Sequence, residues 1–315
     1  MKILFTADIH IKLGQKNVPV DWARARYKML FEQLNGLEKL ADLLVLGGDI
    51  WDKTPTMDEL EIFFDYVHSI KIPAIIFSGN HESVKKNTTF FSNFKNLVKN
   101  LNPQVTVIDD FYTLDNVDFI PYNKLKEYNP ADINFHGDIL CTHVRGEIPP
   151  HVKPEVPLEL FERWKVVLAG DLHSYENSQR NILYPGSPVT TSFHRNNVDT
   201  GVILLDSDTF THKWIKLDLP QLIRKTIKVG DAMFPTPYDH TIYEIEGDIS
   251  ELGSLQDNEL IDKKIVKRDF DTVLILTPDL SLKEEVNEYL KYVLQLNDAA
   301  IEQALQELNN YADKL

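Results

Sequence analysis

Short apolar runs alternate with longer amphipathic stretches over the first 220 residues of the chain. The runs are three or four residues long and bounded by polar or turn-forming residues, which is typical of buried β-strands. They are Ile3–Phe5, Leu43–Leu46, Ala74–Phe77, Val105–Ile108, Ile139–Cys141, Val166–Leu168 and Val202–Leu205. Between the early runs, Asp21–Leu40 and Asp58–Ile70 carry apolar residues at helical spacing. This alternation predicts a layered α/β fold, and the later strands, with few helices between them, predict a second sheet packed on the first.

The pattern changes near Leu219-Pro220, where we place a domain boundary. Four strand-like stretches follow it: Ile223–Val229, His240–Ile245, Lys264–Lys267 and Thr272–Leu276. An acidic, turn-rich segment lies among these strands. The strands and this segment together predict a small α+β domain. After Pro278 apolar residues recur at helical spacing, most regularly from Ile301 to Leu315. The predicted organisation is therefore 1–220, 221–278 and 279–315.

Composition and charge restrict the class of protein. Of the 315 residues, 43% are apolar and 26% charged, an ordinary globular composition. No apolar run approaches the roughly 18 residues of a membrane span, and Asp8 comes too early for a signal peptide, so we expect a cytoplasmic protein without a membrane partner. The single cysteine, Cys141, excludes an internal disulfide or a cysteine zinc cage. A net charge of −15 argues against broad electrostatic binding of nucleic acid, so a role on DNA needs a local site, a metal or a partner.

Five strand ends are each followed by Asp, Asn or His. These residues are Asp8 and His10, Asp49 after Gly47-Gly48, Asn80 and His81 after Gly79, His143, and Asp171 and His173 after Gly170. Because open α/β sheets bind ligands outside the carboxyl ends of their strands, we expect these side chains to converge. Oxygen and imidazole ligands without thiolate suit Mn²⁺, Fe²⁺, Mg²⁺ or Zn²⁺. Seven of these eight residues, all except His81, are the candidate ligands. Seven are too many for one octahedral ion but suit two bridged by Asp49, and such a pair would activate water against a phosphate.

Each of these residues also has a simpler explanation when taken alone. Asp8 and His10 could be a capping pair or a surface pair, and Asp49 could be a turn residue or a helix N-cap. Asn80-His81 could form an Asx-turn, and His143 could be a packing residue. It is their order along the chain that favours a metal site. The histidines without such a setting are assigned to the surface or to packing: His68, His136, His151, His212 and His240. Cys141 is assigned to a buried strand.

The order Asp-x-His, Gly-Gly-Asp, Gly-Asn-His-Glu, strand-end His and Gly-x-x-His resembles that of the calcineurin-like metallophosphoesterases, over residues 1–217. Within them the chain is similar to the SbcD-type nuclease subunits that process DNA double-strand breaks. The narrower likeness rests on Ala7–His10, Gly79–Glu82, Tyr184–Pro188 and Asp199–Asp206. Its length is closer to compact phage-encoded members. The resemblance implies a two-sheet α/β/β/α sandwich core with a small C-terminal α+β capping domain and C-terminal helices.

The resemblance also implies roles for individual residues. Asp8, His10, Asp49 and His173 match the ligands of the first metal, and Asp49, Asn80, His143 and Asp171 match those of the second. His81 matches the non-ligand histidine that meets the scissile phosphate and aids departure of the leaving group. Two Mn²⁺ ions, with Mg²⁺ as the alternative, are the implied cofactors. Asp171 stands where cellular members usually carry His, and a carboxylate there should favour Mn²⁺ or Mg²⁺ over softer ions.

Local cationic side chains and partner proteins would bind the DNA. The candidate DNA contacts are Lys85, Lys86, Arg145, His194 and Arg195, although a solvated loop charge explains each equally well. The family works as a nuclease dimer bound to two SbcC-type coiled-coil ATPases, so the resemblance implies an ATPase and a second copy as partners. The apolar stripe from Ile301 to Leu315 would dock on that ATPase or close the small domain. Asp21–Leu40 and Asp58–Ile70 are candidates for the dimer face.

Three functions stay open at this point. The first is a Mn²⁺-dependent DNA exonuclease, with endonuclease activity as a further expectation, acting in recombination and repair. The second is a metal-dependent phosphatase or nucleotide phosphodiesterase, which Tyr184–Pro188 and the separate C-terminal domain disfavour. The third is a non-catalytic clamp subunit, in which Asp171 in place of the usual His would reflect loss of the catalytic site. The otherwise complete ligand set disfavours this function.

Overall fold

The structure is a computed structural model that describes residues 1–85, 88–133, 135–256, 258–266, 280–294 and 296–312. The chain divides into two compact units. One comprises Met1–Glu244 and Asp257–Lys263, and the other Ile245–Gln256 and Lys264–Leu315. This division does not coincide with the domain boundaries predicted at residues 220 and 278, which stay predictions.

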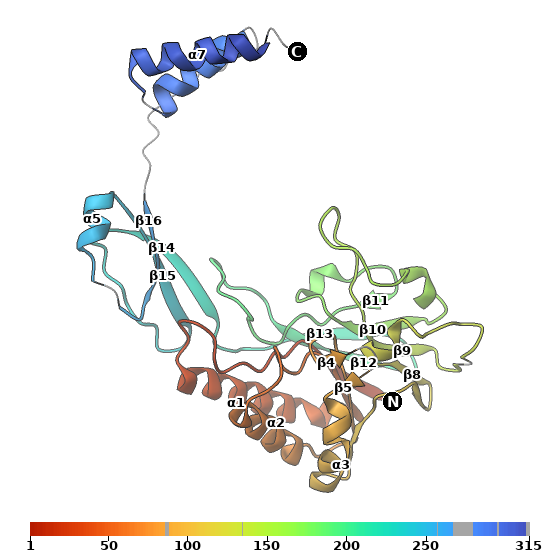
Figure 1. The fold of residues 1–315 in the computed structure, drawn as a ribbon. Coiled ribbons are helices and arrows are strands. Elements are labelled where there is room, and N and C mark those ends of the chain that lie inside the picture. Colours follow the sequence, from red (N-terminus) through yellow and green to blue (C-terminus); the bar gives the residue numbers. More distant parts are fainter. Residues whose placement is uncertain (86–87, 134, 257, 267–279, 295, 313–315) are drawn as a thin grey trace. The chain divides into compact units, whose positions relative to one another are not determined.

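A six-stranded sheet in the first unit has the strand order β13-β12-β1-β2-β3-β6. Two of its strands, β12 and β13, are labelled in Figure 1. Its strands are β1 (Lys2–Thr6), β2 (Leu43–Gly47), β3 (Ala74–Phe77), β6 (Val105–Val107), β12 (Gly201–Asp206) and β13 (His212–Lys216). Strands β1, β2, β3 and β6 are parallel, whereas β12 pairs with β1 and β13 in antiparallel fashion. The carboxyl ends of β1, β2 and β3 therefore lie at one edge of the sheet, where the predicted site residues begin.

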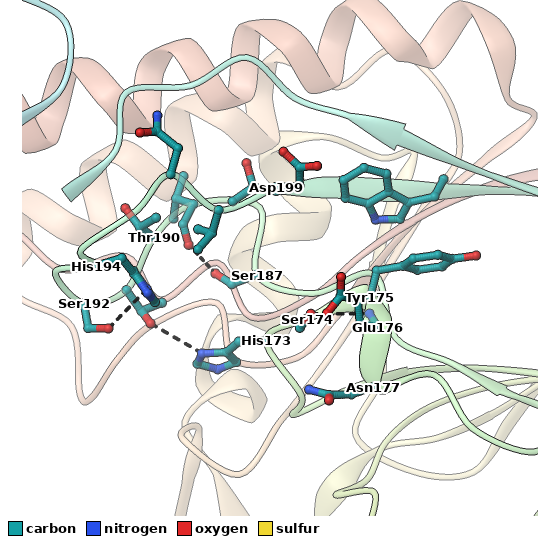
Figure 2. A pocket seen from close by; sticks show the side chains of 16 residues that line it. His173, Ser174, Tyr175, Glu176, Asn177, Ser187, Thr190, Ser192, His194 and Asp199 are labelled. Atoms are coloured by element: carbon teal, nitrogen blue, oxygen red, sulfur yellow. Dashed lines mark hydrogen bonds between the residues drawn. The ribbon is translucent and has the colours of Figure 1, made fainter. Parts of the chain in front are cut away.

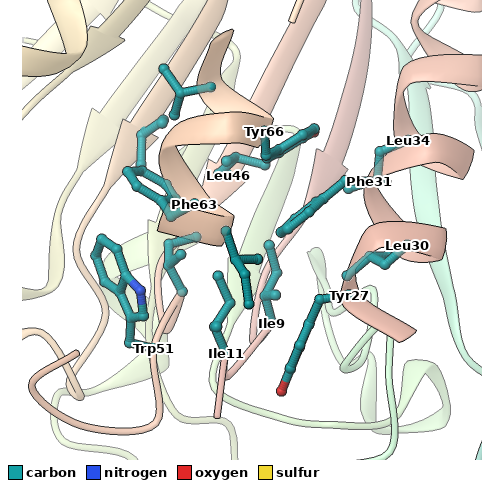
Figure 3. Packing of buried hydrophobic residues seen from close by; sticks show 14 of the residues in the cluster. Ile9, Ile11, Tyr27, Leu30, Phe31, Leu34, Leu46, Trp51, Phe63 and Tyr66 are labelled. Carbon is teal, nitrogen blue, oxygen red and sulfur yellow. The ribbon is translucent and has the colours of Figure 1, made fainter. Parts of the chain in front are cut away.

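Three helices cover the outer face of this sheet: α1 (Val20–Leu37, followed by η1, Glu38–Leu40), α2 (Met57–Ser69) and α3 (Phe91–Leu101). The α1 stripe buries Leu30 and Leu34, and α2 begins with a capping box between Thr56 and Glu59. Figure 3 shows Leu30 and Leu34 of α1 and Phe63 of α2 in one apolar cluster with Ile9 and Leu46.

A second sheet has the order β11-β10-β9-β8-β7. Its strands are β7 (Tyr112–Leu114), β8 (Val117–Ile120), β9 (Ile139–His143), β10 (Val166–Gly170) and β11 (Ile182–Leu183). Ile3 and Phe5 of the first sheet and Ile139 of the second meet in one apolar cluster between the sheets. Leu140 faces the opposite way, into a cluster covered by α4 (Tyr122–Leu125) and η2 (Leu158–Phe161). The predicted α/β/β/α sandwich is thereby confirmed.

The remaining elements are small. Strands β4 (Ser83–Lys85) and β5 (Thr88–Thr89) form a two-stranded ribbon, and η3 spans Tyr175–Asn177. Strands β14 (Leu222–Lys228), β15 (His240–Gly247) and β16 (Ile261–Val266) form a three-stranded sheet in that order, with α5 (Ile249–Ser254) after β15. Strand β16 begins three residues before the predicted Lys264, and the predicted strand Thr272–Leu276 lies outside the described residues.

The last part of the chain carries the two helical segments that the sequence predicted. They are α6 (Leu282–Glu288), continued by a π-helical segment η4 (Tyr289–Val293), and α7 (Asp298–Ala312). On α7 the stripe residue Ile301 is buried, and Leu315 lies outside the described residues. Within the described part of the chain, no helix combines the length and apolar character needed to cross a membrane.

Candidate metal centre

Hydrogen bonds from backbone amides tie the loops after β1, β2, β3 and β10 together, some to backbone carbonyls and some to the Asp8 and Asp49 carboxylates. The Asp8 amide donates to the Gly48 carbonyl at 3.0 Å, and the His10 amide donates to the Asp49 carbonyl at 2.9 Å. The Asp171 amide donates to the Asp8 carboxylate at 3.0 Å, which joins the edges of the two sheets. The seven predicted ligands therefore lie in one place, although their roles as ligands stay predictions.

Glycines permit this close approach. A Cβ on Gly79 would lie 2.2 Å from Asp49 Oδ1, and one on Gly170 would lie 2.6 Å from His143 Nδ1. Neither distance is tolerable, so a side chain at these positions would force the loops apart. The glycines in the sequence signature are thus required by packing around the candidate ligands.

Four of the candidate ligands have left-handed backbone. Their φ angles are 57° for Asp8, 48° for His10, 51° for Asp49 and 103° for Asp171. This region is uncommon for residues other than glycine and costs on the order of 1–3 kcal/mol at each position. Strain of this kind persists where surrounding hydrogen bonds over-determine the loop, and it concentrates at functional sites.

Asp8, His10 and His173 form the first group of candidate ligand atoms, all within 4.8 Å of one another. The Nε2 atoms of His10 and His173 are 3.1 Å apart. Burial lowers the pKa of His10 to about 3, so its ring is neutral and can offer a lone pair. Two facing imidazole nitrogens beside the Asp8 carboxylate are a donor set that fits a metal ion.

Asp49, Asn80, His143 and Asp171 form the second group. His143 donates from Nδ1 to the Gly47 carbonyl at 2.8 Å, which leaves Nε2 to face the group. That nitrogen lies 3.5 Å from Asp49 Oδ2 and 4.0 Å from Asp171 Oδ1. The Asn80 amide lies 2.9 Å from the same nitrogen, and with its NH₂ group turned toward Asp49 it donates to Oδ2 at 3.0 Å. Asn80 is therefore placed next to Asp49 and His143, within reach of a cation that they would hold.

Asp49 is shared by the two groups. Its Oδ2 atom is 3.7 Å from His10 Nε2 and 3.5 Å from His143 Nε2. Burial favours protonation of Asp49, but the charge and hydrogen bond of His143 outweigh it and hold the pKa of Asp49 well below its usual range. Burial would conversely depress the pKa of His143, yet the Asp49, Asp8 and Asp171 carboxylates raise it to about 10. The cluster therefore demands positive charge, which divalent cations would supply.

His81 lies at the rim of the cluster. Its amide donates to Asp49 Oδ1 at 2.9 Å, and its Nδ1 donates to the Asp52 carbonyl at 2.6 Å. The remaining ring nitrogen, Nε2, therefore points toward the cluster, 3.8 Å from Asp49 Oδ2. With 36% of the side chain exposed, the ring is accessible to a substrate as well as to the site.

The predicted DNA contacts are dispersed. Arg145 donates from Nε and Nη2 to the two oxygens of Asp171, at 3.0 and 3.3 Å. Arg195 is 64% exposed and donates to Glu244 at 2.7 Å, whereas His194 lies 3.4 Å from Ser192 Oγ. The DNA-contact candidate Lys85 ends β4, and Lys86 lies outside the described residues. None of these placements tests DNA binding, which stays a prediction.

Other predicted assignments can be located as well. Cys141 is buried, and burial raises the pKa of its thiol, as expected of an inert strand residue. The histidines assigned to the surface or to packing make no part of the candidate ligand groups among the described residues.

Sequence reasoning missed three residues that hold the site in shape. The Ser187 hydroxyl lies 2.7 Å from the Asp8 carbonyl, and the Tyr27 hydroxyl donates to the His10 carbonyl at 2.7 Å. Glu82 accepts from the amides of Asp49 at 2.9 Å, Gly79 at 2.7 Å and Trp51 at 3.1 Å. Glu82 and Ser187 stand within the sequence signatures, but nothing local to them or to Tyr27 revealed their distant partners.

Glu82→Gln should destabilise the protein. Burial and the Asp49 charge raise the pKa of Glu82 to about 7, and the three amides offset that cost. Glutamine would turn an NH₂ donor toward one of those amides, and a buried N–H without an acceptor costs about 1–3 kcal/mol. Urea unfolding should show a loss of that size. Glu32→Gln, on the exposed face of α1, is the control and should change stability by less than about 0.5 kcal/mol.

The chain is similar to several known proteins. The family model "Calcineurin-like phosphoesterase" matches residues 1–204. "Probable exonuclease subunit 1" of Escherichia phage T5 is 41% identical over 99% of this chain and 98% of its own. "Putative phosphoesterase 244L" of Invertebrate iridescent virus 6 is 25% identical over 73% of this chain and 86% of its own. Among solved structures, protein TT1561 of Thermus thermophilus is 13% identical with a TM-score of 0.44, covering 68% of this chain and 98% of that chain.

Proposed function

Because this chain belongs to the calcineurin-like phosphoesterase family, and is thus a metal-dependent phosphodiesterase, we propose that it is the Mn²⁺-dependent DNA exonuclease subunit of an SbcCD-type complex. The observation that carries the proposal is the position of Asp49, whose Oδ2 lies 3.7 Å from His10 Nε2 and 3.5 Å from His143 Nε2, with the accessible His81 beside it. A 41% identical relative of matching length bears the name of an exonuclease subunit, which supports DNA as the substrate.

The donor set suits two divalent ions. Asp8, His10, Asp49 and His173 would hold the first, and Asp49, Asn80, His143 and Asp171 the second. When bound, such a pair activates water and neutralises the oxygens of the phosphate. Carboxylate, amide and imidazole donors without thiolate favour Mn²⁺, with Mg²⁺ as the second candidate.

The chain's own groups supply orientation and a proton. The Gly47 carbonyl fixes the tautomer of His143, and the Asp52 carbonyl fixes that of His81. A protonated His81 Nε2 would then donate to the oxygen of the leaving group, since its Nδ1 proton is already committed. The Asp171 carboxylate is held by Arg145 and by the strained loop that bears it.

The test of function compares two substrates in Mn²⁺. We expect shortening of linear duplex DNA from its ends, and chelation should abolish it. If the protein hydrolyses p-nitrophenyl phosphate esters but does not cleave DNA, the result would instead support a phosphatase or nucleotide phosphodiesterase. Inactivity on both substrates, with metal bound, would support the non-catalytic clamp.

Arg145 should be a positioning residue for Asp171. Arg145→Ala frees a carboxylate that two hydrogen bonds now orient, so we expect the Mn²⁺ affinity of one site to fall about 10–100-fold. We expect an intermediate Mn²⁺ affinity for Arg145→Lys, because lysine keeps the positive charge but cannot make the bidentate hydrogen bonds of arginine. Isothermal titration calorimetry measures this directly. Arg24→Ala, which removes an exposed ion pair on α1, is the control. If the Mn²⁺ affinities stay unchanged and KM for DNA rises, Arg145 is a phosphate contact instead.

The proposed protein partners are an SbcC-type ATPase and a second copy of the chain. In the second unit, large apolar side chains are exposed, namely Leu282, Tyr289, Tyr292, Leu294 and Leu296. Exposed apolar side chains at this density along one segment support docking of another protein. Truncation after residue 278 should abolish co-purification with the ATPase and spare Mn²⁺-dependent cleavage. Loss of folding on truncation would favour a role in closing the small domain.

A further inference from the structure

A pocket of about 670 Å³ lies beside the candidate metal centre (Figure 2). Its walls come from the segment after β10, from the Ser187–Asp199 loop and from Trp214 on β13. This volume is within the roughly 300–1,000 Å³ of pockets that bind small ligands. Among the candidate metal ligands and His81, His173 alone belongs to the described lining of this pocket.

Two residues join the pocket to the metal centre. His173 turns Nε2 toward His10 at 3.1 Å, and its Nδ1 lies 3.4 Å from Thr191 Oγ1 in the pocket wall (Figure 2). Ser187 also lines the pocket, and its hydroxyl lies 2.7 Å from the Asp8 carbonyl. A substrate whose phosphate lies at the metal centre can therefore extend past His173 into this space.

The lining selects against phosphate. Among its described lining residues there is no lysine or arginine, whereas Glu176 and Asp199 contribute carboxylates, of which Asp199 is paired with Lys216 outside the lining. A phosphate entering the pocket would meet the Glu176 carboxylate and no lysine or arginine of the lining. The pocket therefore favours an uncharged group over a phosphate.

The same lining suits a polar, planar group. Tyr175 and Trp214 stand together at one side, with ring centroids 5.6 Å apart and planes 31° from parallel. Hydroxyls and amides occupy the rest of the wall, among them Ser174, Thr190 and Asn177. Aromatic surface with hydrogen-bonding groups around it is the environment that binds nucleobases irrespective of sequence.

We propose that this pocket binds the terminal nucleoside of the DNA strand and thereby sets the adjoining phosphate on the metal centre. The inference deepens the proposed nuclease function and rests on it. Base and sugar are the uncharged parts of the substrate, and His173 marks the point where the phosphate must stop. Holding one nucleoside in this way favours attack next to a strand end over attack within a duplex.

Asn177→Trp fills the pocket and tests the proposal. Asn177 lines it from η3, and its side chain makes no hydrogen bond among the described residues. With the Mn²⁺-loaded protein, we expect KM for thymidine 5′-(p-nitrophenyl phosphate) to rise at least about tenfold more than KM for bis(p-nitrophenyl) phosphate, which lacks a nucleoside. Asn93→Trp, the same change on an exposed position of α3, is the matched control. Equal effects of Asn177→Trp on both esters would overturn the proposal.

Binding of a free nucleoside separates this proposal from the nuclease function. Saturation-transfer NMR should detect deoxyadenosine on the wild type and on Asn93→Trp, with a signal several-fold weaker on Asn177→Trp. Equal signals on all three would reject the pocket even if the protein degrades DNA. A signal that Asn177→Trp removes, in a protein that leaves DNA intact, would keep the pocket and reject the nuclease.

Discussion

Asp49→Asn should reduce hydrolysis of DNA by about 1,000-fold or more. The Asp49 carboxylate lies 3.7 Å from His10 Nε2 and 3.5 Å from His143 Nε2, so its replacement weakens both candidate metal sites at once. Stabilisation of phosphate charge by metal ions is worth several kcal/mol, and each 1.4 kcal/mol is a factor of about ten in rate. Mn²⁺ titration should show fewer than two ions bound at concentrations that saturate the wild type.

The substitution isolates charge from shape. Asparagine has the size of aspartate and tolerates left-handed backbone, which the φ of 51° at position 49 requires. Folding should therefore survive, and circular dichroism would check it. Asp65→Asn, the same change on the exposed face of α2, should alter neither metal binding nor rate. Two tightly bound ions and near-normal cleavage in Asp49→Asn would refute the shared-ligand arrangement.

Buried strands were predictable wherever the chain is uniformly apolar, and less so where it is not. Strand β8 contains Asp118, which interrupts its apolar run, yet Asp118 is fully buried. Its carboxylate accepts from the Thr113 hydroxyl at 2.8 Å, the Gly137 amide at 3.0 Å and the Trp164 indole at 2.8 Å. A buried charge with distant partners reads as a surface residue in sequence, so β8 and its neighbour β7 were missed.

Helix α5 was missed for a different reason. It lies in the acidic segment assigned to turns, and only six residues, Ile249–Ser254, are helical. The signal available was the capping box in which Asp248 and Glu251 bond each other's backbone amides. Acidic residues at a helix start are stabilising there, so the composition that suggested a turn was compatible with a helix.

The candidate site was predictable to the extent that strand ends specify it. Parallel β1, β2 and β3 bring Asp8, Asp49 and Asn80 to one edge by topology alone. The partners that orient these groups could not be predicted, because they come from loops far along the chain. Ser187 is 179 residues from Asp8, and Arg145 is 26 from Asp171. Contacts of this kind depend on packing that no local pattern encodes.

His81→Asn should lower cleavage of DNA about 10²–10⁴-fold and leave both metal ions in place. Asparagine at this position keeps the backbone amide that bonds Asp49 but lacks the ring whose Nε2 faces the cluster. The loss should depend on the leaving group, since an alkoxide needs a proton and p-nitrophenolate scarcely does. We therefore expect a much smaller effect on bis(p-nitrophenyl) phosphate than on DNA.

The leaving-group dependence is what distinguishes a proton donor from a ligand. His81 lies within reach of Asp49 and His10, so a ligand role predicts equal losses on both substrates together with weaker Mn²⁺ binding. A donor role predicts unequal losses at unchanged metal affinity, because only the step that expels the poor leaving group requires the proton. His68→Asn, on the exposed side of α2, controls for loss of a histidine and should behave as the wild type on both substrates. Rates and calorimetric affinities measured on the same preparations would decide between the two roles.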